Sequence, residues 1–329
     1  MLTNISNQKK RLAYCFGIAI IAAAVMVVGS YQIGIAADVK QVKQKSFKSP
    51  EEAAKALFDA AKAEDTKGLL AIFGPAGKEI ISSGDEVADK AARERFVKAY
   101  EAMNKLERET DKKVTLIVGN HDWPYPVPIV KKGETWIFET MAGKEELLNR
   151  RIGRNELNTI ETCLAIVDAQ REYAMKDRDS DKLLEYAQKF ASTPGKKDGL
   201  YWQTKEGEPQ SPLGDLVAKA VKEGYGPRKP SQSQGPRPYH GYYFKILKAQ
   251  GKNAPGGAYD YVVNGNMIGG FALVAYPAEY GASGIMTFIV NHDGVVYEKN
   301  LGKETGKIAS AMTKFDPDKT WKKAEEQKN

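Results

Sequence analysis

Residues 143–176, GKEELLNRRIGRNELNTIETCLAIVDAQREYAMK, form the longest helical pattern in this 329-residue chain. Apolar side chains recur there at steps of three to five residues, which is the spacing of one face of an α-helix. They are Leu147, Leu148, Ile152, Leu157, Ile160, Cys163, Leu164, Val167 and Ala174. Gly153 weakens the pattern locally, because glycine is a poor helix former. We expect one long helix whose start, near residue 143, marks a module boundary.

Upstream of this segment, the periodicity predicts three helices followed by a hairpin. Residues 49–52, SPEE, start the first helix, because serine caps, proline suits the first turn and glutamate completes a capping box. Further helices are predicted at residues 66–73 and 85–106. Alternating apolar residues and a turn at residues 131–134 then indicate antiparallel strands. The sequence therefore predicts an N-terminal α+β module over residues 49–142.

Downstream, the pattern changes from helices to strands. Shorter helices are predicted at residues 181–190 and 211–223, the second capped by Ser211. The strand-forming runs are residues 242–247, 259–263, 270–276, 285–290 and 295–298. An Asp-Gly pair at residues 293–294 predicts a hairpin between the last two runs. We expect a second α+β module over residues 143–302, followed by a polar C-terminal tail at 303–329.

The first 37 residues have the layout of a secretory signal peptide. A basic Lys9–Arg11 segment precedes an apolar run at residues 12–28, and small residues follow at 34–37. The apolar run lies at the lower edge of the length that spans a bilayer, so an uncleaved inner-membrane anchor is the alternative. We expect a periplasmic or secreted protein of the bacterial envelope, with residues 38–48 as a polar tether.

The charge pattern bears on a nucleic-acid partner, and the cysteine count bears on disulfide formation. The net charge is +7, but Lys9, Lys10 and Arg11 supply three of these positive charges. No block of basic residues is interleaved with aromatics, so no nucleic-acid partner is expected. Cys163 is the only cysteine after the leader, which excludes an intrachain disulfide. Its position on the apolar helical stripe predicts a buried, inert thiol.

Three long motifs connect the chain to a known family. They are RRIGRNE at residues 150–156, APGGAYDYVVNGNMIGGFALVAYPAEYGASGIMTF at 254–288 and DGVVYEKNLG at 293–302. The sequence carrying them resembles the exported bacterial family named domain of unknown function 2950. That resemblance implies an exported envelope protein without an established activity.

Two weaker likenesses concern the fold. The helices followed by the GETWIF hairpin, residues 133–138, are similar in order to cone-like modules of the nuclear-transport-factor-2 type. The long helix containing LAIVDAQREYA, residues 164–174, and the strands after it resemble the globular part of a type IV pilin or pseudopilin. Here, however, the helix is internal and carries Arg150, Arg151 and Arg154, so the likeness supports a fold rather than fibre assembly. We predict an α+β protein with a cone-like N-terminal module and a pilin-like second module.

Two groups of residues are candidates for ligand binding. Trp123, Tyr125 and Trp136 are placed to line the mouth of the predicted cone as a pocket for a small apolar ligand. Core or rim packing is the alternative for these aromatics. The second group is the polar RRIGRNE segment, for which we favour a structural network between the modules. An anion or carboxylate site is its alternative, and it would use Arg151, Arg154 and Glu156.

No local motif encodes a metal site or a cofactor. His121, His240 and His292 lack the spacing of zinc ligands and have no cysteine partner. Ser283 and His292 with Asp293 could form a triad only by tertiary placement, since the serine is not in a nucleophile elbow. Turn formation explains Asn291 and Asp293 more simply than calcium binding does.

These observations favour a non-catalytic envelope protein that binds a partner protein or small ligand, or has a structural role. The enzyme question stays open, because cone-like modules can hold acid and base pairs. A hydrolase or isomerase using His121 and Asp122 is therefore the first alternative. A surface-fibre or secretion-system component is the second. Membrane contact is expected only through an uncleaved N-terminal segment.

Export is expected to remove residues 1–36 or 1–37, because small residues follow the apolar run. Intact-mass analysis of the protein from the envelope fraction measures this directly. A full-length chain that only detergent extracts would favour the anchor instead.

Overall fold

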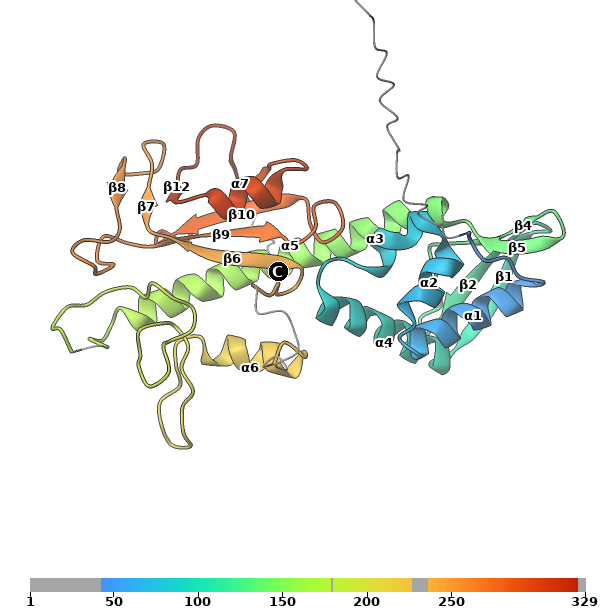
Figure 1. Cartoon of the computed structure of the whole chain (residues 1–329), viewed down its shortest axis with the longest axis horizontal. Helices are drawn as coiled ribbons and strands as arrows, with labels where there is room; N and C mark the ends of the chain where they lie inside the picture. Colours follow the sequence, from blue (N-terminus) through green and yellow to red (C-terminus); the bar gives the residue numbers. More distant parts are fainter. Residues whose placement is uncertain (1–42, 179, 227–235, 325–329) are drawn as a thin grey trace, which may run out of the picture. The chain divides into compact units, whose positions relative to one another are not determined.

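The computed structural model describes residues 43–178, 180–226 and 236–324 (Figure 1). Helices and largely antiparallel sheets within these ranges confirm the predicted α+β fold. The cone-like and pilin-like likenesses and the module boundaries stay predictions. The predicted signal peptide lies outside the described residues, and no helix among those described is long and apolar enough to cross a membrane.

The first helix begins where its capping box predicts. Ser49 Oγ accepts from the backbone N–H of Glu52 at 3.2 Å, and Glu52 Oε2 accepts from Lys48 N–H at 2.7 Å. The helices of this half are α1 (Pro50–Lys62), α2 (Thr66–Phe73), the 3₁₀ helix η1 (Pro75–Gly77), α3 (Lys78–Ile81) and α4 (Glu86–Ala102). The helix expected at 85–106 is therefore correct in type but ends earlier, at Ala102.

A five-stranded antiparallel sheet follows these helices. Its strands are β1 (Asn104–Thr110), β2 (Lys113–Val118), β3 (Trp123–Pro124), β4 (Ile129–Lys132) and β5 (Thr135–Phe138). The order is β1-β2-β4-β5, with β3 paired to β2. The β4–β5 hairpin was predicted, whereas β1 was not, because its NKLERET sequence carries a single apolar residue, Leu106. Backbone pairing with the apolar β2 makes this polar segment a strand.

The segment expected as a polar tether is partly folded. Phe47 is buried and exchanges two backbone hydrogen bonds of 2.8 Å with Trp136. The Gln44 amide donates to the carbonyls of Ile72 and Phe138 at 3.0 and 2.7 Å. The tether prediction is therefore wrong for residues 43–48, because one aromatic side chain brings its polar neighbours into the core; residues 38–42 lie outside the description.

Helix α5 (Thr140–Tyr173) confirms the long helical prediction and starts three residues earlier than the predicted start at Gly143. Its Leu147 packs against the first hydrophobic cluster, whereas Cys163 and Val167 belong to the second. Two residues of the predicted apolar stripe, Leu157 and Leu164, are 41% and 37% exposed. The helix therefore contributes to both cores, but with a face rotated from the predicted one.

Polar residues explain this rotation of the buried face of α5. Residues 152, 155, 159, 163, 166, 170 and 173 are buried at helical spacing, and three of them are polar. Asn155 Nδ2 donates to Ser283 O at 2.9 Å, and Gln170 forms two 2.8 Å hydrogen bonds with the backbone of Ala187. Thr159 donates within the helix, to Asn155 O. A count of apolar residues misses such positions, because their burial depends on partners distant in the sequence.

The helix predicted at residues 181–190 is wrong. Asp177 accepts from the backbone N–H groups of Ser180 and Lys182, and Asp181 accepts from Leu183 N–H. These bonds give the backbone an alternative to the helical ladder, and the positive φ angles of Ser180 and Lys182 interrupt it. The next helix, α6 (Gly214–Lys222), is shorter than the predicted 211–223 range, and Ser211 does not cap it.

The second half contains two sheets. The larger consists of β6 (Tyr242–Leu247), β9 (Ala272–Pro277), β10 (Met286–Asn291), β11 (Tyr297–Asn300) and β13 (Lys322–Lys323), in the antiparallel order β13-β11-β10-β9-β6. The smaller consists of β7 (Ala249–Gln250), β8 (Tyr259–Asp260) and β12 (Lys314–Phe315), in the order β12-β7-β8. The predicted β10–β11 hairpin is confirmed, with Gly294 in its turn at a φ of 80°.

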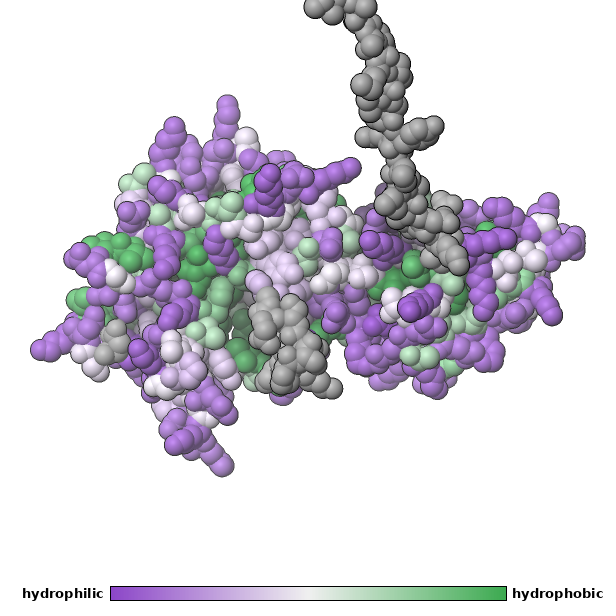
Figure 2. Space-filling view, viewed as in Figure 1, coloured by the Kyte–Doolittle hydropathy of each residue, from purple (hydrophilic) through white to green (hydrophobic). Residues whose placement is uncertain are grey.

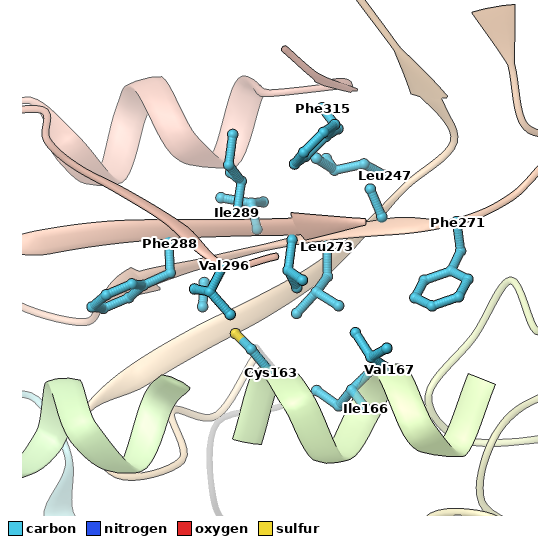
Figure 3. Packing of buried hydrophobic residues seen from close by; sticks show 14 of the residues in the cluster. Cys163, Ile166, Val167, Leu247, Phe271, Leu273, Phe288, Ile289, Val296 and Phe315 are labelled. Carbon is cyan, nitrogen blue, oxygen red and sulfur yellow. The ribbon is translucent and has the colours of Figure 1, made fainter. Parts of the chain in front are cut away.

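Both faces of the larger sheet are covered (Figure 3). On one face Cys163 and Val167 of α5 point toward Leu273 and Phe288, and burial raises the pKa of the Cys163 thiol, as expected for an inert cysteine. On the other face lie Ile289, Leu247 and Phe315, beside α7 (Thr305–Ala311). Coverage on both sides accounts for the nearly continuous apolar sequences of β9 and β10.

The polar tail predicted from residue 303 is therefore folded as far as residue 324. It contains α7, β12 and β13, and its Ala309 and Phe315 are fully buried. Its few apolar side chains were outnumbered by charged ones in the sequence. They are nevertheless enough to close the second face of the sheet.

Phe315→Ala should lower the free energy of unfolding by about 3–5 kcal/mol, because it removes a fully buried ring from the core. Ile308→Ala is the matched control in the same segment, since Ile308 is 44% exposed and should change stability by less than about 0.5 kcal/mol. Urea unfolding measures both. Equal stability of the two variants would contradict the assignment of this segment to the core.

Candidate functional site

A cavity of about 620 Å³ lies among α1, α2, α4, β2, β3 and α5. Its inner wall is apolar and belongs to the first hydrophobic cluster. The buried apolar residues of the wall are Leu57, Ala61, Leu69, Phe73, Ile81, Val118 and Tyr125, and the buried polar ones are Ser83, Asp89 and Asn155. The cavity is therefore an extension of the core that side chains leave unfilled.

The sequence of α4 explains the unfilled space. Four alanines of this helix, Ala88, Ala91, Ala92 and Ala99, line the cavity. Their methyl groups are too short to meet the opposite wall, and Phe96 is the large apolar side chain that α4 contributes. Figure 2 shows mainly hydrophilic residues on the visible face around α1 and α4. The helix thus presents small residues inward and polar residues outward.

Arginines dominate the polar part of the lining. Arg93 and Arg95 come from α4, and Arg150, Arg151 and Arg154 come from α5. The acidic lining residues are Asp89 and Glu223. The cavity thus combines an apolar inner wall with a positively charged border.

Arg151 is held in place by backbone carbonyls. Its guanidinium donates to Glu79 O at 2.6 Å, to Ile80 O, and to Ala282 O at 3.4 Å. Burial lowers the pKa of Arg151, and the nearby Asp89 carboxylate opposes that effect. Arg151 therefore joins α3 and the loop before β10 to α5.

Glu156 has a corresponding role farther along α5. Its Oε1 accepts from the backbone N–H groups of Ile285 and Met286, both at 2.9 Å, and from the Tyr242 hydroxyl at 3.4 Å. The favoured interpretation of RRIGRNE as a structural network is confirmed for Arg151 and Glu156. Glu156 does not line the cavity.

The three candidate aromatics are divided between cavity and core. Trp123, 36% exposed, and the buried Tyr125 line the cavity. Trp136 instead packs in the first hydrophobic cluster, with the Arg108 guanidinium 5.9 Å from its ring centre. Arg150 lies 5.4 Å from the Trp123 ring centre and forms a 2.6 Å ion pair with Glu146. The cavity thus brings together Trp123, Tyr125, Arg151 and Arg154 of the sequence candidates and leaves out Trp136 and Glu156.

Three cavity residues of α4 were missed by sequence reasoning. Arg93 and Arg95 follow two alanines, Ala91 and Ala92, on a helix that carries six other charged residues, so the local sequence did not single them out. Asp89 is buried and accepts from Ser83 N–H at 2.9 Å and from the Ser83 hydroxyl at 2.8 Å. Burial raises the pKa of Asp89, whereas the hydrogen bonds from Ser83 and the charge of Arg151 oppose the rise.

A second set of hydrogen bonds fixes α4 from its N-terminal end. Asp85 Oδ1 caps α4 by accepting from Val87 and Ala88 N–H, both at 3.1 Å. Its Oδ2 accepts from the Tyr225 hydroxyl and from Gly241 N–H, both at 2.8 Å. Tyr225 itself lines the cavity. The wall that α4 supplies is therefore tied to segments more than a hundred residues away in the chain.

The residues considered for catalysis are engaged elsewhere. Asp122 forms a 2.8 Å ion pair with Lys105, and the exposed His121 lines the cavity without a hydrogen bond to Asp122. The Ser283 hydroxyl bonds the backbone of Glu279 at 2.9 and 3.1 Å. Within the described ranges, these contacts assemble neither the suspected acid–base pair nor a serine-centred triad.

Turn formation accounts for the residues considered for calcium. Asn291 Nδ2 donates to Asp293 Oδ2 at 3.1 Å, and Asp293 N–H donates to Asn291 Oδ1 at 3.2 Å. In the part of the chain that the structure describes, no group of three or more histidine, cysteine or acidic residues could hold a metal ion.

Comparison with known proteins identifies the family. A family model described as "Protein of unknown function (DUF2950)" matches residues 44–324, and the chain therefore belongs to this family. No curated protein and no solved structure matches the chain.

Arg151→Ala and Glu156→Ala should each lower the free energy of unfolding by about 1–3 kcal/mol, because each leaves backbone groups without a partner. Glu156→Gln should be milder, since its amide oxygen can still accept. Arg154→Ala, on the exposed part of the same helix, is the control and should stay within about 0.5 kcal/mol of the parent. Melts of the Arg151 and Glu156 variants that match the parent would contradict the network.

Proposed function

We propose that this member of the family is an exported, non-catalytic protein of the bacterial envelope that binds a small, largely apolar ligand in the α4–α5 cavity. The observation that carries the proposal is the cavity itself. Its volume of about 620 Å³ lies within the roughly 300–1,000 Å³ typical of ligand pockets. Its mainly apolar wall with a few polar groups at the border is also typical of such sites.

The support for a preformed pocket is the bonding of its walls. Asp85 anchors the N-terminal end of α4, and Arg151 anchors α5 to α3. A wall fixed in this way loses little conformational freedom when a ligand enters, which favours affinity. These bonds therefore support binding without a large rearrangement of the chain.

The support for a non-catalytic role is the engagement of the nearby acids. Of the two acidic lining residues, Asp89 is bonded by Ser83, and Glu223 is paired with His240 and the Tyr239 hydroxyl. Asp122, outside the lining, pairs with Lys105. A general base must reach the proton that it removes, and these carboxylates face other partners. The support for export is the signal-peptide layout of residues 1–37.

The test uses the purified mature protein and N-phenylnaphthylamine, a neutral apolar dye whose fluorescence rises when it leaves water. We expect a saturable rise with about one site per chain. Ala91→Trp should weaken dye binding at least tenfold, because Ala91 lines the cavity and the larger side chain would occupy it. Fluorescence titration measures both effects.

Ala102→Trp is the matched control. Ala102 is an exposed residue at the end of the same helix and does not line the cavity, so its variant should bind the dye like the parent. Absence of saturable binding in the parent, or equal binding by the Ala91 and Ala102 variants, would overturn the proposal.

A further inference from the structure

Three arginines that line the cavity, Arg93, Arg95 and Arg154, have no hydrogen-bond, ion-pair or ring partner among the described residues, and two of them, Arg95 and Arg154, are exposed at its border. Arg95 on α4 and Arg154 on α5 both line the cavity. Within the described part of the chain, neither guanidinium makes a hydrogen bond, an ion pair or a ring contact. Arg150 and Arg151 differ in this respect, because Glu146 and backbone carbonyls occupy them.

The cavity has a charged end that faces solvent and an apolar end that is buried. Arg95 and Arg154 are exposed, so they stand where the cavity meets solvent. The opposite wall is buried and apolar, with Leu57, Leu69 and Phe73 among its residues. A molecule with one polar and one apolar end would therefore enter with its polar end at the arginines.

The charges at the border repel one another. Partial burial lowers the pKa of Arg95 and the positive charge of Arg154 lowers it further, whereas the Glu94 carboxylate opposes this shift. Arg151 adds a third positive charge close to Arg154. Asp89, the buried carboxylate of the lining, is already bonded to Ser83. Glu223, the other acidic lining residue, pairs with His240 at 3.1 Å. The five lining arginines therefore leave an excess of positive charge at the border, which an anion would neutralise.

We infer that the ligand of this cavity is a single-chain amphiphile with an anionic head, whose carboxylate lies between Arg95 and Arg154 and whose apolar chain contacts the inner wall. The inference rests on the proposed function, because it names the ligand class of that same site. Guanidinium groups suit a carboxylate, since their planar N–H donors can bind both of its oxygens. The apolar chain of the ligand needs only an apolar surface, which the buried wall provides.

The experiment compares two competitors that differ only in the head group. Dodecanoate, below its critical micelle concentration, and dodecanol, below its solubility limit, are titrated against N-phenylnaphthylamine bound to the parent protein. Dodecanoate should displace the dye at a concentration about tenfold or more below that of dodecanol, because it gains charge-assisted hydrogen bonds. Raising the salt concentration to about 1 M should reduce this preference, since salt screens exposed charges.

Variants test which residues produce the preference. In the double variant Arg95→Gln/Arg154→Gln, the two competitors should displace the dye within about twofold of each other, while dye binding itself is retained. The control Lys67→Gln/Lys98→Gln removes the same charge from exposed residues outside the cavity and should keep the parent preference. Neither arginine has a hydrogen-bond or ion-pair partner among the residues that the structure describes, so the double variant should melt like the parent.

The outcomes separate the two proposals. Dye binding with equal displacement by acid and alcohol in the parent would overturn this inference and leave the proposed function standing. If the double variant still bound dodecanoate more tightly than dodecanol, the inference would also be overturned, because the carboxylate would then bind elsewhere. Failure of the parent to bind the dye at all would overturn both.

Discussion

The guanidinium of Arg151 is partly buried and needs acceptors, which it finds on the backbone of two distant parts of the chain. Glu79 and Ile80 lie before α4, whereas Ala282 lies in the loop that leads to β10. An unpaired charge in this position would be costly, so the carbonyls must stay close to α5. Glu156 imposes the complementary constraint with backbone N–H groups of the same loop. Together the two side chains hold both halves of the described structure against one helix.

The hydrogen bonds of Arg151, Glu156 and Asp85, which form a frame around α5, also explain why a cavity persists beside this helix. Asp85 ties the start of α4 to Tyr225 and Gly241, and α4 cannot move inward to fill the space that its alanines leave. A gap of this size normally costs stability, because the wall loses contacts on one side. Its retention in a bonded frame is consistent with a site kept open for a ligand. Two arginines of α5 differ in the same way, since Arg151 is bonded to α3 and to the loop before β10, whereas Arg154 makes no hydrogen bond or ion pair with the described residues.

The local sequence predicted elements whose signals are short-range. The capping box at Ser49 started α1, the alternating residues predicted β2, and the Asp293-Gly294 pair predicted the β10–β11 hairpin. Prediction failed where the pattern of apolar residues did not show which backbone or side-chain partner a segment would take. Strand β1 exists because β2 pairs with it, and Asp177 and Asp181 replaced a predicted helix with side-chain bonds to the backbone. In the candidate site, four of six predicted residues line the cavity, while Arg95 was found only when α4 and α5 were placed together.

The sequence by itself determined the fold class, the long helix, the family and the polar character of the RRIGRNE segment, because these depend on periodicity and on motifs contiguous along the chain. Only the tertiary structure decided which polar residues of that helix are structural. Arg151 and Arg154 are one turn apart and identical in chemistry, yet one meets carbonyls from both halves and the other meets none. The cavity is likewise a tertiary property, since alanines on one helix become a space only when the opposite wall is held at a distance. Neither the partners of a buried charge nor the gap between two elements is encoded by neighbours in the sequence, and both arise from contacts between residues far apart along it.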